Sequence, residues 1–234
     1  MHDATRSSFA GDSLRAHALL FENPLRPTHD AAAGVRMLVA FVLVAVVALY
    51  ALRATMPLVA PIAKLSFVAL LTLLFLVVHR WYVRVPFAAI GLRGRGQWTR
   101  REALYLVQVG VLASIAFVVI FRRHFERLWT FGPLDFLVIV ATGLAWGAVQ
   151  EFLYRGWLQT ELTRRWGPWA GLLVANVLFT LGPLHVNYAN LGAIDPGLIA
   201  AIFAIGLLFG LIYQRSGNLW IPAVLHGLWP LNMS

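Results

Sequence analysis

The sequence predicts an all-α, polytopic membrane protein, a helix bundle of about seven transmembrane helices around a polar cavity. Three observations predict this class. Hydrophobic residues make up 60% of the 234 residues and charged residues only 12%, whereas a soluble domain carries about 25% charged residues. The mean hydropathy is +0.74. The apolar residues also fall into blocks of about twenty, the length that crosses a hydrocarbon core of about 30 Å.

The apolar blocks divide the chain into three parts. Residues 1–35 are polar and form a predicted cytoplasmic tail, in which two prolines discourage a continuous helix. Residues 36–79 hold two N-terminal helices, and residues 80–234 form the core. The candidate spans are about residues 36–55, 58–79, 103–121, 134–163, 168–187, 196–214 and 218–231.

Basic residues predict the orientation in the membrane. The net charge of +9 comes from 18 Arg and one Lys, clustered in short segments between apolar blocks. A cytoplasmic N-terminus places the tail, Arg164, Arg165, Arg215 and the Arg-rich loop 80–102 inside, which agrees with the positive-inside rule. The cluster FRRHFERLW (121–129) argues against this orientation. The expected location is the bacterial inner membrane, because the chain is rich in Ala and uses Arg over Lys.

The composition and motifs of the chain exclude some partners and some kinds of catalysis. No basic stretch is interleaved with aromatic residues, so nucleic acid is not an expected partner. The expected partners are membrane lipid and a protein or peptide substrate at the membrane. The chain has no Cys, which excludes disulfides, thiolate nucleophiles and Cys-ligated metals. Neither Ser66 nor Ser114 has a nucleophile-elbow motif around it.

Three ionisable residues lie inside the apolar blocks. Glu151, in GLAWGAVQEFLYRGWLQ (143–159), is the one acidic residue well inside a block, and His185 and His226 are the histidines that fall inside spans. An ionisable group at this depth costs about 2.5–3.5 kcal/mol, so it is a functional candidate by default. Each has a structural alternative as well. Arg155, one turn after Glu151, can form a structural ion pair with it or extend to the interface.

The three side chains are predicted to share one layer of the membrane. A helix rises about 1.5 Å per residue, which places Glu151, His185 and His226 about 21, 26 and 16 Å from the basic ends of their helices. Gly182 and Pro183 interrupt a span just before His185, which supports a polar cavity there. Gly206 and Gly210 are read as a small-residue packing face.

A carboxylate and two imidazoles at one depth favour hydrolysis. The carboxylate can take a proton from water, and an imidazole can stabilise the oxyanion on the attacked carbonyl. Glu151, His185 and His226 would also be the ligands if a divalent metal such as zinc were bound. The sequence has no HExxH spacing, so no cofactor or metal is expected.

These motifs, in this order, resemble the CAAX protease and bacteriocin-processing family of intramembrane proteases. Its usual pattern is Glu-Glu-xxx-Arg-Gly, then Phe-xxx-His, then His-xxx-Asn. The matching segments are QEFLYRG (150–156), LGPLH (181–185) and HGLWP (226–230), and GLLFGLIYQRSGNLWIPAVLHG (206–227) resembles a longer family run. The resemblance covers about residues 80–231.

The resemblance implies an all-α bundle around a conical cavity that hydrolyses peptide bonds in or near the membrane. Its motif residues Glu151, Arg155, His185 and His226 are retained. Three positions depart from it, with Gln150 in place of the first Glu, Leu181 in place of Phe and Pro230 in place of Asn. The first Glu is the residue that the family credits with activating water.

The functional hypothesis is a glutamate-dependent intramembrane endopeptidase that processes a CAAX-type or C-terminal tag. Glu151, oriented by Arg155, would polarise a water; His185 would shuttle the proton; and His226, with the Gln150 amide, would stabilise the oxyanion. Two alternatives remain. One is a catalytically degenerate member that acts as a membrane scaffold or bacteriocin-immunity protein. The other is a transporter, which the absence of inverted repeats disfavours.

Overall fold

All elements of the described part of the chain are helical. The computed structural model describes residues 25–55, 61–94, 96, 98–120, 122, 126, 130–182 and 196–228, and no strand occurs among them. The all-α prediction is therefore confirmed. The elements are α1 (Ala31–Thr55), α2 (Pro61–Val78), η1 (His79–Val83), η2 (Phe87–Ile90), α3 (Arg100–Ile120), α5 (Pro133–Glu151), η4 (Phe152–Gln159), α6 (Thr160–Trp166), α7 (Pro168–Thr180), α9 (Pro196–Ser216) and α10 (Trp220–Gly227).

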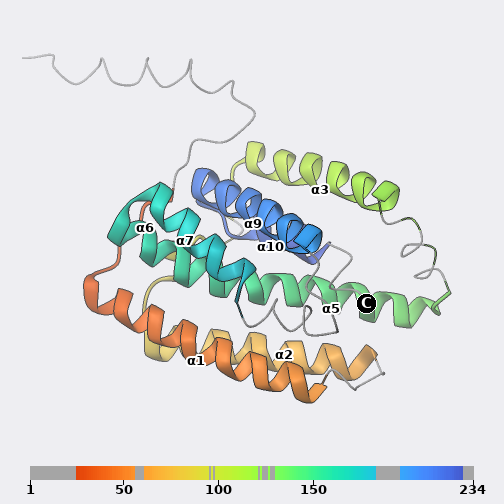
Figure 1. Cartoon of the computed structure of the whole chain (residues 1–234), viewed down its shortest axis with the longest axis horizontal. Coiled ribbons are helices and arrows are strands. Elements are labelled where there is room, and N and C mark those ends of the chain that lie inside the picture. The colour runs from red at the N-terminus through yellow and green to blue at the C-terminus, as the bar shows by residue number, and fades with distance from the viewer. Residues whose placement is uncertain are drawn as a thin grey trace, which may run out of the picture.

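The run α5–η4–α6 is the central element of the bundle (Figure 1). One side of α5 packs against α2 and another against α10, while α7 packs against both α6 and α9. The pair α1 and α2 covers one side of this run, and α3 lies on the opposite, outer side (Figure 1). The middle of the central run is therefore surrounded by other helices.

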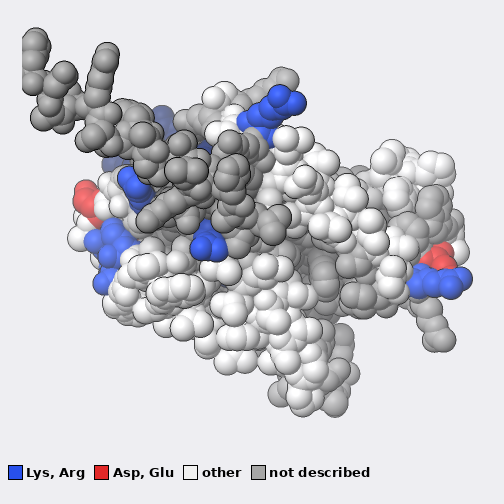
Figure 2. Space-filling model, turned by 90° about the horizontal axis from the view of Figure 1, so that it is seen from above, with Lys and Arg blue, Asp and Glu red and all other residues white. Residues whose placement is uncertain are grey.

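Four helical stretches in the described residues are long and apolar enough to cross a membrane. They are Ala31–Tyr50, Ile62–Val83, Pro133–Trp166 and Ile199–Ser216. The surface in Figure 2 is mostly uncharged, as expected for helices that face lipid. In its described residues, the predicted span 168–187 contains α7, of 13 residues. The described part of the predicted span 218–231 contains α10, of eight residues. Both are shorter than the about 20 residues that a crossing needs, so a count of seven spans remains a prediction.

The predicted helix 134–163 is interrupted by a π-helical stretch. The eight residues of η4 follow Glu151 directly, and the Thr160 hydroxyl donates to the Arg155 carbonyl, five residues earlier, at 3.0 Å. A second π-helix, η1, is attached to η4 because Trp157 Nε1 donates to His79 Nδ1 at 2.9 Å. π-helical turns occur frequently at functional sites. The sequence reading missed both π-helices and did not count the fully buried His79 among the histidines of the spans.

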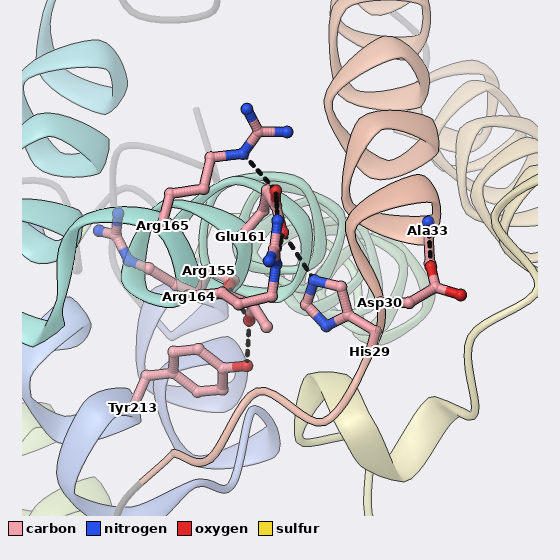
Figure 3. Close-up of polar contacts among 9 residues, drawn as sticks. His29, Asp30, Ala33, Arg155, Glu161, Arg164, Arg165 and Tyr213 are labelled. Atoms are coloured by element: carbon pink, nitrogen blue, oxygen red, sulfur yellow. Dashed lines mark hydrogen bonds and ion pairs between the residues drawn. The ribbon is translucent and has the colours of Figure 1, made fainter.

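Glu161, in α6 at one end of the central run, is fully buried (Figure 3). Its oxygens accept from Arg164 at 2.7 Å and from Arg165, and His29 Nε2 lies 2.7 Å from one of them. His29 lies in the predicted tail (1–35), and Glu161 lies in the predicted span 134–163. The structure uses this pair to fasten the segment before α1 to α6.

The segment 25–30 is held at two further points. Leu25 N donates to the Gln214 carbonyl at 2.8 Å, and the Asp30 carboxylate accepts from Ala33 N at 2.6 Å, which caps the start of α1. The first helix therefore begins at Ala31 rather than at residue 36, the predicted boundary. The rest of the predicted tail, residues 1–24, lies outside the described residues.

The contact between α1 and Glu161 predicts a steric effect at Gly34. A Cβ added there would overlap the Glu161 carboxylate, which its three partners hold in place. Gly34→Ala is expected to lower the free energy of unfolding by about 1–3 kcal/mol. Thermal unfolding in detergent micelles, followed by tryptophan fluorescence, measures this change. Gly110→Ala is the control, because a Cβ at Gly110 meets nothing within 4 Å; equal stability of both variants would contradict the packing of α1 on Glu161.

Candidate active site

Glu151 is the centre of the candidate site. It is the last residue of α5 and its side chain is fully buried. Its Oε1 lies 2.8 Å from His226 Nδ1 on α10, and its Oε2 lies 3.2 Å from Arg155 Nε on η4. The structure thus brings three of the five predicted site residues into direct contact.

A pair of glycines lets α5 and α10 approach closely enough for this contact. A Cβ at Gly147 would overlap the backbone of Gly227, and a Cβ at Gly227 would lie 2.5 Å from Leu144 Cα. Gly147 precedes Glu151 by one turn, and Gly227 follows His226 directly. Close backbone contact here therefore places the carboxylate beside the imidazole. The sequence reading did not single out this pair, because the two glycines lie 80 positions apart.

Arg155 is bound inside the bundle. It has no exposed side-chain surface, and its Nη2 donates to the Gly206 carbonyl at 2.8 Å. One turn later, Gln159 Nε2 donates to the Gly210 carbonyl at 2.9 Å. The interpretation of Arg155 as a side chain extending to the interface is therefore wrong. The two glycines do form a packing face, but that face also accepts hydrogen bonds from η4 and so fixes Arg155.

Phe179 joins the residues around Glu151, and the sequence reading missed it. The Arg155 guanidinium lies over its ring at 4.5 Å from the centroid. The rings of Tyr154 and His226 meet it edge to face, at centroid distances of 5.1 and 5.7 Å. Phe179 is two residues from Leu181, the position at which the family motif has Phe. The motif departure was noted at Leu181, and nothing in the local pattern pointed to Phe179 instead.

Gln150, the fourth predicted site residue, is buried beside Glu151 in the sequence. Its Oε1 has no hydrogen-bond partner among the described residues. A buried polar atom without a partner costs about 1–3 kcal/mol, so such an atom calls for an explanation. His185, the fifth predicted residue, and Pro230 lie outside the described residues.

The residues around Glu151 fit a divalent metal poorly. One carboxylate oxygen faces an imidazole N–H and the other a guanidinium, and the Arg155 charge repels a cation at this place. In the described part of the chain, no three His, Cys, Asp or Glu residues are close enough to hold a metal ion. The third member of the predicted set, His185, is outside that part.

The Glu151–His226 contact determines which imidazole nitrogen carries the lone pair. When Nδ1–H donates to the carboxylate, a neutral imidazole has its lone pair on Nε2. A carboxylate on Nδ1 also stabilises the imidazolium that forms when Nε2 takes a proton. The arrangement can therefore act as a proton-accepting dyad in a site shielded from bulk water.

A family model matches the part of the chain that contains Glu151 and His226. Residues 132–231 match the model of the type II CAAX prenyl endopeptidases, Rce1-like. Residues 132–231 are therefore similar to this family. We call them the Rce1-like core; in the described residues the core contains α5, η4, α6, α7, α9 and α10. The resemblance seen in the sequence is thereby confirmed, and with its apolar helices the chain is an integral membrane protein.

Two curated proteins are similar over longer stretches than the Rce1-like core. The uncharacterized 24.3 kDa protein of Escherichia coli is 29% identical over 157 residues, which is 65% of this chain and 69% of that protein. The uncharacterized protein YpbD of Bacillus subtilis (strain 168) is 26% identical over 130 residues, 52% of this chain and 61% of YpbD. No solved structure matches the chain.

The buried ion pair of the Rce1-like core predicts a large effect of removing one partner. Arg155→Met leaves Glu151 without its cation and is expected to lower the free energy of unfolding by about 3–5 kcal/mol. Arg122→Met is the matched control, because Arg122 and Glu126 form a pair of the same spacing with 81% and 58% exposed side chains, and an exposed pair contributes less than about 1 kcal/mol.

The double variant Glu151→Gln/Arg155→Met, compared with each single variant, tests whether the Glu151 and Arg155 side chains stabilise each other. Because it removes both charges, it is expected to regain part of the stability lost in Arg155→Met. Thermal unfolding in micelles measures all the variants. Strictly additive losses would show that the two side chains do not stabilise each other.

Proposed function

We propose that this protein is an intramembrane endopeptidase that hydrolyses a peptide bond in a membrane-presented protein or peptide of the CAAX or C-terminal-tag type. The observation that carries the proposal is the 2.8 Å contact between Glu151 and His226. Glu151 lies in the candidate span Pro133–Trp166, and both residues lie in the Rce1-like core. A buried carboxylate–imidazole pair of this kind is suited to taking a proton from water.

In the proposed mechanism, His226 Nε2 accepts a proton from the attacking water, and Glu151 stabilises the resulting imidazolium. The water oxygen then bonds to the scissile carbonyl carbon. As the tetrahedral intermediate breaks down, the imidazolium returns the proton to the leaving amine. This assignment differs from the sequence hypothesis, which made Glu151 the base and His226 the oxyanion group. The reason is that Nδ1 of His226 already faces the carboxylate.

Arg155 is a positioning residue in this mechanism. It neutralises the carboxylate, and its bond to the Gly206 carbonyl holds it in place. The Gln150 amide stands next to Glu151 in the sequence and is suited to donate to the developing oxyanion. We also assign His185 to the site, as a proton shuttle, on the family motif alone.

Cleavage of a fluorogenic, farnesylated CAAX-type peptide by the purified protein tests the proposal. His226→Ala and Glu151→Ala are expected to lower kcat/KM by at least about a hundredfold, because each removes one half of the proton-transfer pair. Arg122→Met, which changes an exposed pair far along the chain, is the control and keeps wild-type turnover. Cleavage by both site variants at the control rate would rule out the mechanism.

One observation favours a second function, that of a non-catalytic family member. The Gln150 position carries an amide where the family motif has a carboxylate, and the amide oxygen is buried without a partner among the described residues. A degenerate member would retain peptide binding and lose hydrolysis, acting as a scaffold or immunity protein.

The variant Gln150→Glu separates the two functions. If the Glu151–His226 pair performs the proton transfer, a second carboxylate beside it is expected to leave kcat unchanged or lower it, since like charges at one site oppose each other. A degenerate enzyme would instead gain activity from an inactive starting point. The same peptide assay, run on wild type and Gln150→Glu at equal folded concentration, distinguishes these results.

A further inference from the structure

Three polar side chains in a row on the central helical run each have an atom without a hydrogen-bond partner among the described residues. Trp146, Gln150 and Tyr154 lie at successive four-residue steps, so they occupy one face across α5 and the start of η4. Their side chains are 4%, 1% and 0% exposed. Trp146 Nε1, Gln150 Oε1 and the Tyr154 hydroxyl are each buried without a partner among the described residues. We call these three residues the unpaired strip.

The neighbouring face of the same run makes direct contacts with α9 and α10, although Arg155 Nε and Nη1 have no hydrogen-bond partner among the described residues. Gly147, Glu151 and Arg155 are each one position later, and they meet Gly227, His226 and the Gly206 carbonyl, respectively. One face thus contacts α9 and α10, and the three polar atoms of the adjacent face have no hydrogen-bond partner among the described residues. Buried polar atoms are nearly always hydrogen-bonded. Three unpaired ones in a row, beside the catalytic pair, therefore indicate a ligand.

Two amide side chains of the core that also have an unpaired oxygen differ from the unpaired strip. Gln159 and Asn176 each have a buried oxygen without a partner, but their amide nitrogens donate to the carbonyls of Gly210 and Phe203 at 2.9 Å. These side chains are fixed by protein contacts. Trp146 and Tyr154 have a single polar atom each, so they make no side-chain hydrogen bond to the described protein at all.

We propose that the unpaired strip binds the backbone of an extended substrate peptide, running along α5 beside Glu151 and His226. This inference rests on the proposed function. The strip is uncharged and offers an indole N–H, an amide oxygen and a hydroxyl, which complement the neutral N–H and C=O groups of a peptide and not a charged headgroup. Side-chain-independent recognition of this kind suits an enzyme that must hold different tags.

The spacing of the strip fits the repeat of an extended chain. Four residues of α-helix rise about 6 Å. An extended peptide presents its backbone groups to the same side every second residue, at about 6.6 Å. For the α-helical step from Trp146 to Gln150 the difference is about 0.6 Å, which small side-chain rotations can absorb, and the next step, to Tyr154, enters the π-helical η4. The scissile bond would then lie beside Gln150, next in sequence to Glu151.

Paired substitutions that each remove one polar atom test the proposal. Trp146→Phe and Tyr154→Phe lose an unpaired atom. Trp157→Phe and Tyr213→Phe lose an atom that the protein itself engages, since Trp157 bonds to His79 and the Tyr213 hydroxyl to Thr160 and Ile90. Each is placed in a His226→Gln background, which stops turnover while keeping a donor toward Glu151. Binding of a fluorescent, farnesylated CAAX-type peptide in micelles is measured by anisotropy, and stability by thermal unfolding.

The two pairs are expected to behave oppositely. Trp146→Phe and Tyr154→Phe should weaken peptide binding about three- to tenfold each, the effect of one lost neutral hydrogen bond, and leave the unfolding temperature unchanged or higher. Trp157→Phe and Tyr213→Phe should lower the unfolding temperature and bind the peptide as the background does. A peptide N-methylated at successive amides should bind the background more weakly, because its backbone donors are lost.

Three results would overturn the proposal. They are unchanged affinity in Trp146→Phe and Tyr154→Phe, equal affinity for the N-methylated peptide, and no binding by the background above that of empty micelles. Because binding is measured without turnover, these results are separate from a failure of the proposed hydrolysis. That failure would appear as an uncleaved peptide that still binds in a strip-dependent manner.

Discussion

The arrangement of the Rce1-like core depends on the burial of one carboxylate, that of Glu151. An uncompensated charge at this depth is strongly unfavourable, so the fold must supply a cation and hydrogen bonds around it. Arg155 comes from the same helical run, but His226 must come from α10. Glycines at the crossing of α5 and α10 make that approach sterically possible. The requirements of one charge thus explain which helices must touch and where small residues are needed.

The π-helical stretch η4 begins at the residue after Glu151 and is held from several sides. Trp157 attaches it to η1, and Thr160 bonds to both the Arg155 carbonyl and the Tyr213 hydroxyl. Arg155 and Gln159 bind carbonyls of α9. A local departure from α-helical geometry is stable here because the surrounding helices stabilise it. It alters the directions of the side chains that follow Glu151, at the place where the candidate chemistry lies.

The central run has two buried carboxylates, Glu161 and Glu151, and their partners give them different roles. Glu161 is bound by two arginines and faces His29, near the basic end of the bundle, and its oxygens are all engaged in fastening α1 to α6. Glu151 contacts Arg155 and the imidazole of His226, and it is next in sequence to Gln150, whose Oε1 has no hydrogen-bond partner among the described residues. The first arrangement is an anchor. The second joins a carboxylate to an imidazole, a pair that is suited to proton transfer.

The sequence by itself predicted the helical class, the apolar spans, the resemblance to the Rce1-like family and the similar heights of Glu151 and His226 along their helices, because block length and the 1.5 Å helical rise are local quantities. Only the tertiary structure decided that Arg155 turns inward, that Phe179 touches three residues around the site, that Gly147 meets Gly227, and that His29 reaches Glu161. These contacts join residues far apart in the chain or depend on a π-helical turn, and neither leaves a periodic pattern in the sequence. The sequence of a helix also does not show which of two neighbouring polar faces will be hydrogen-bonded. The packing of the surrounding helices decides this.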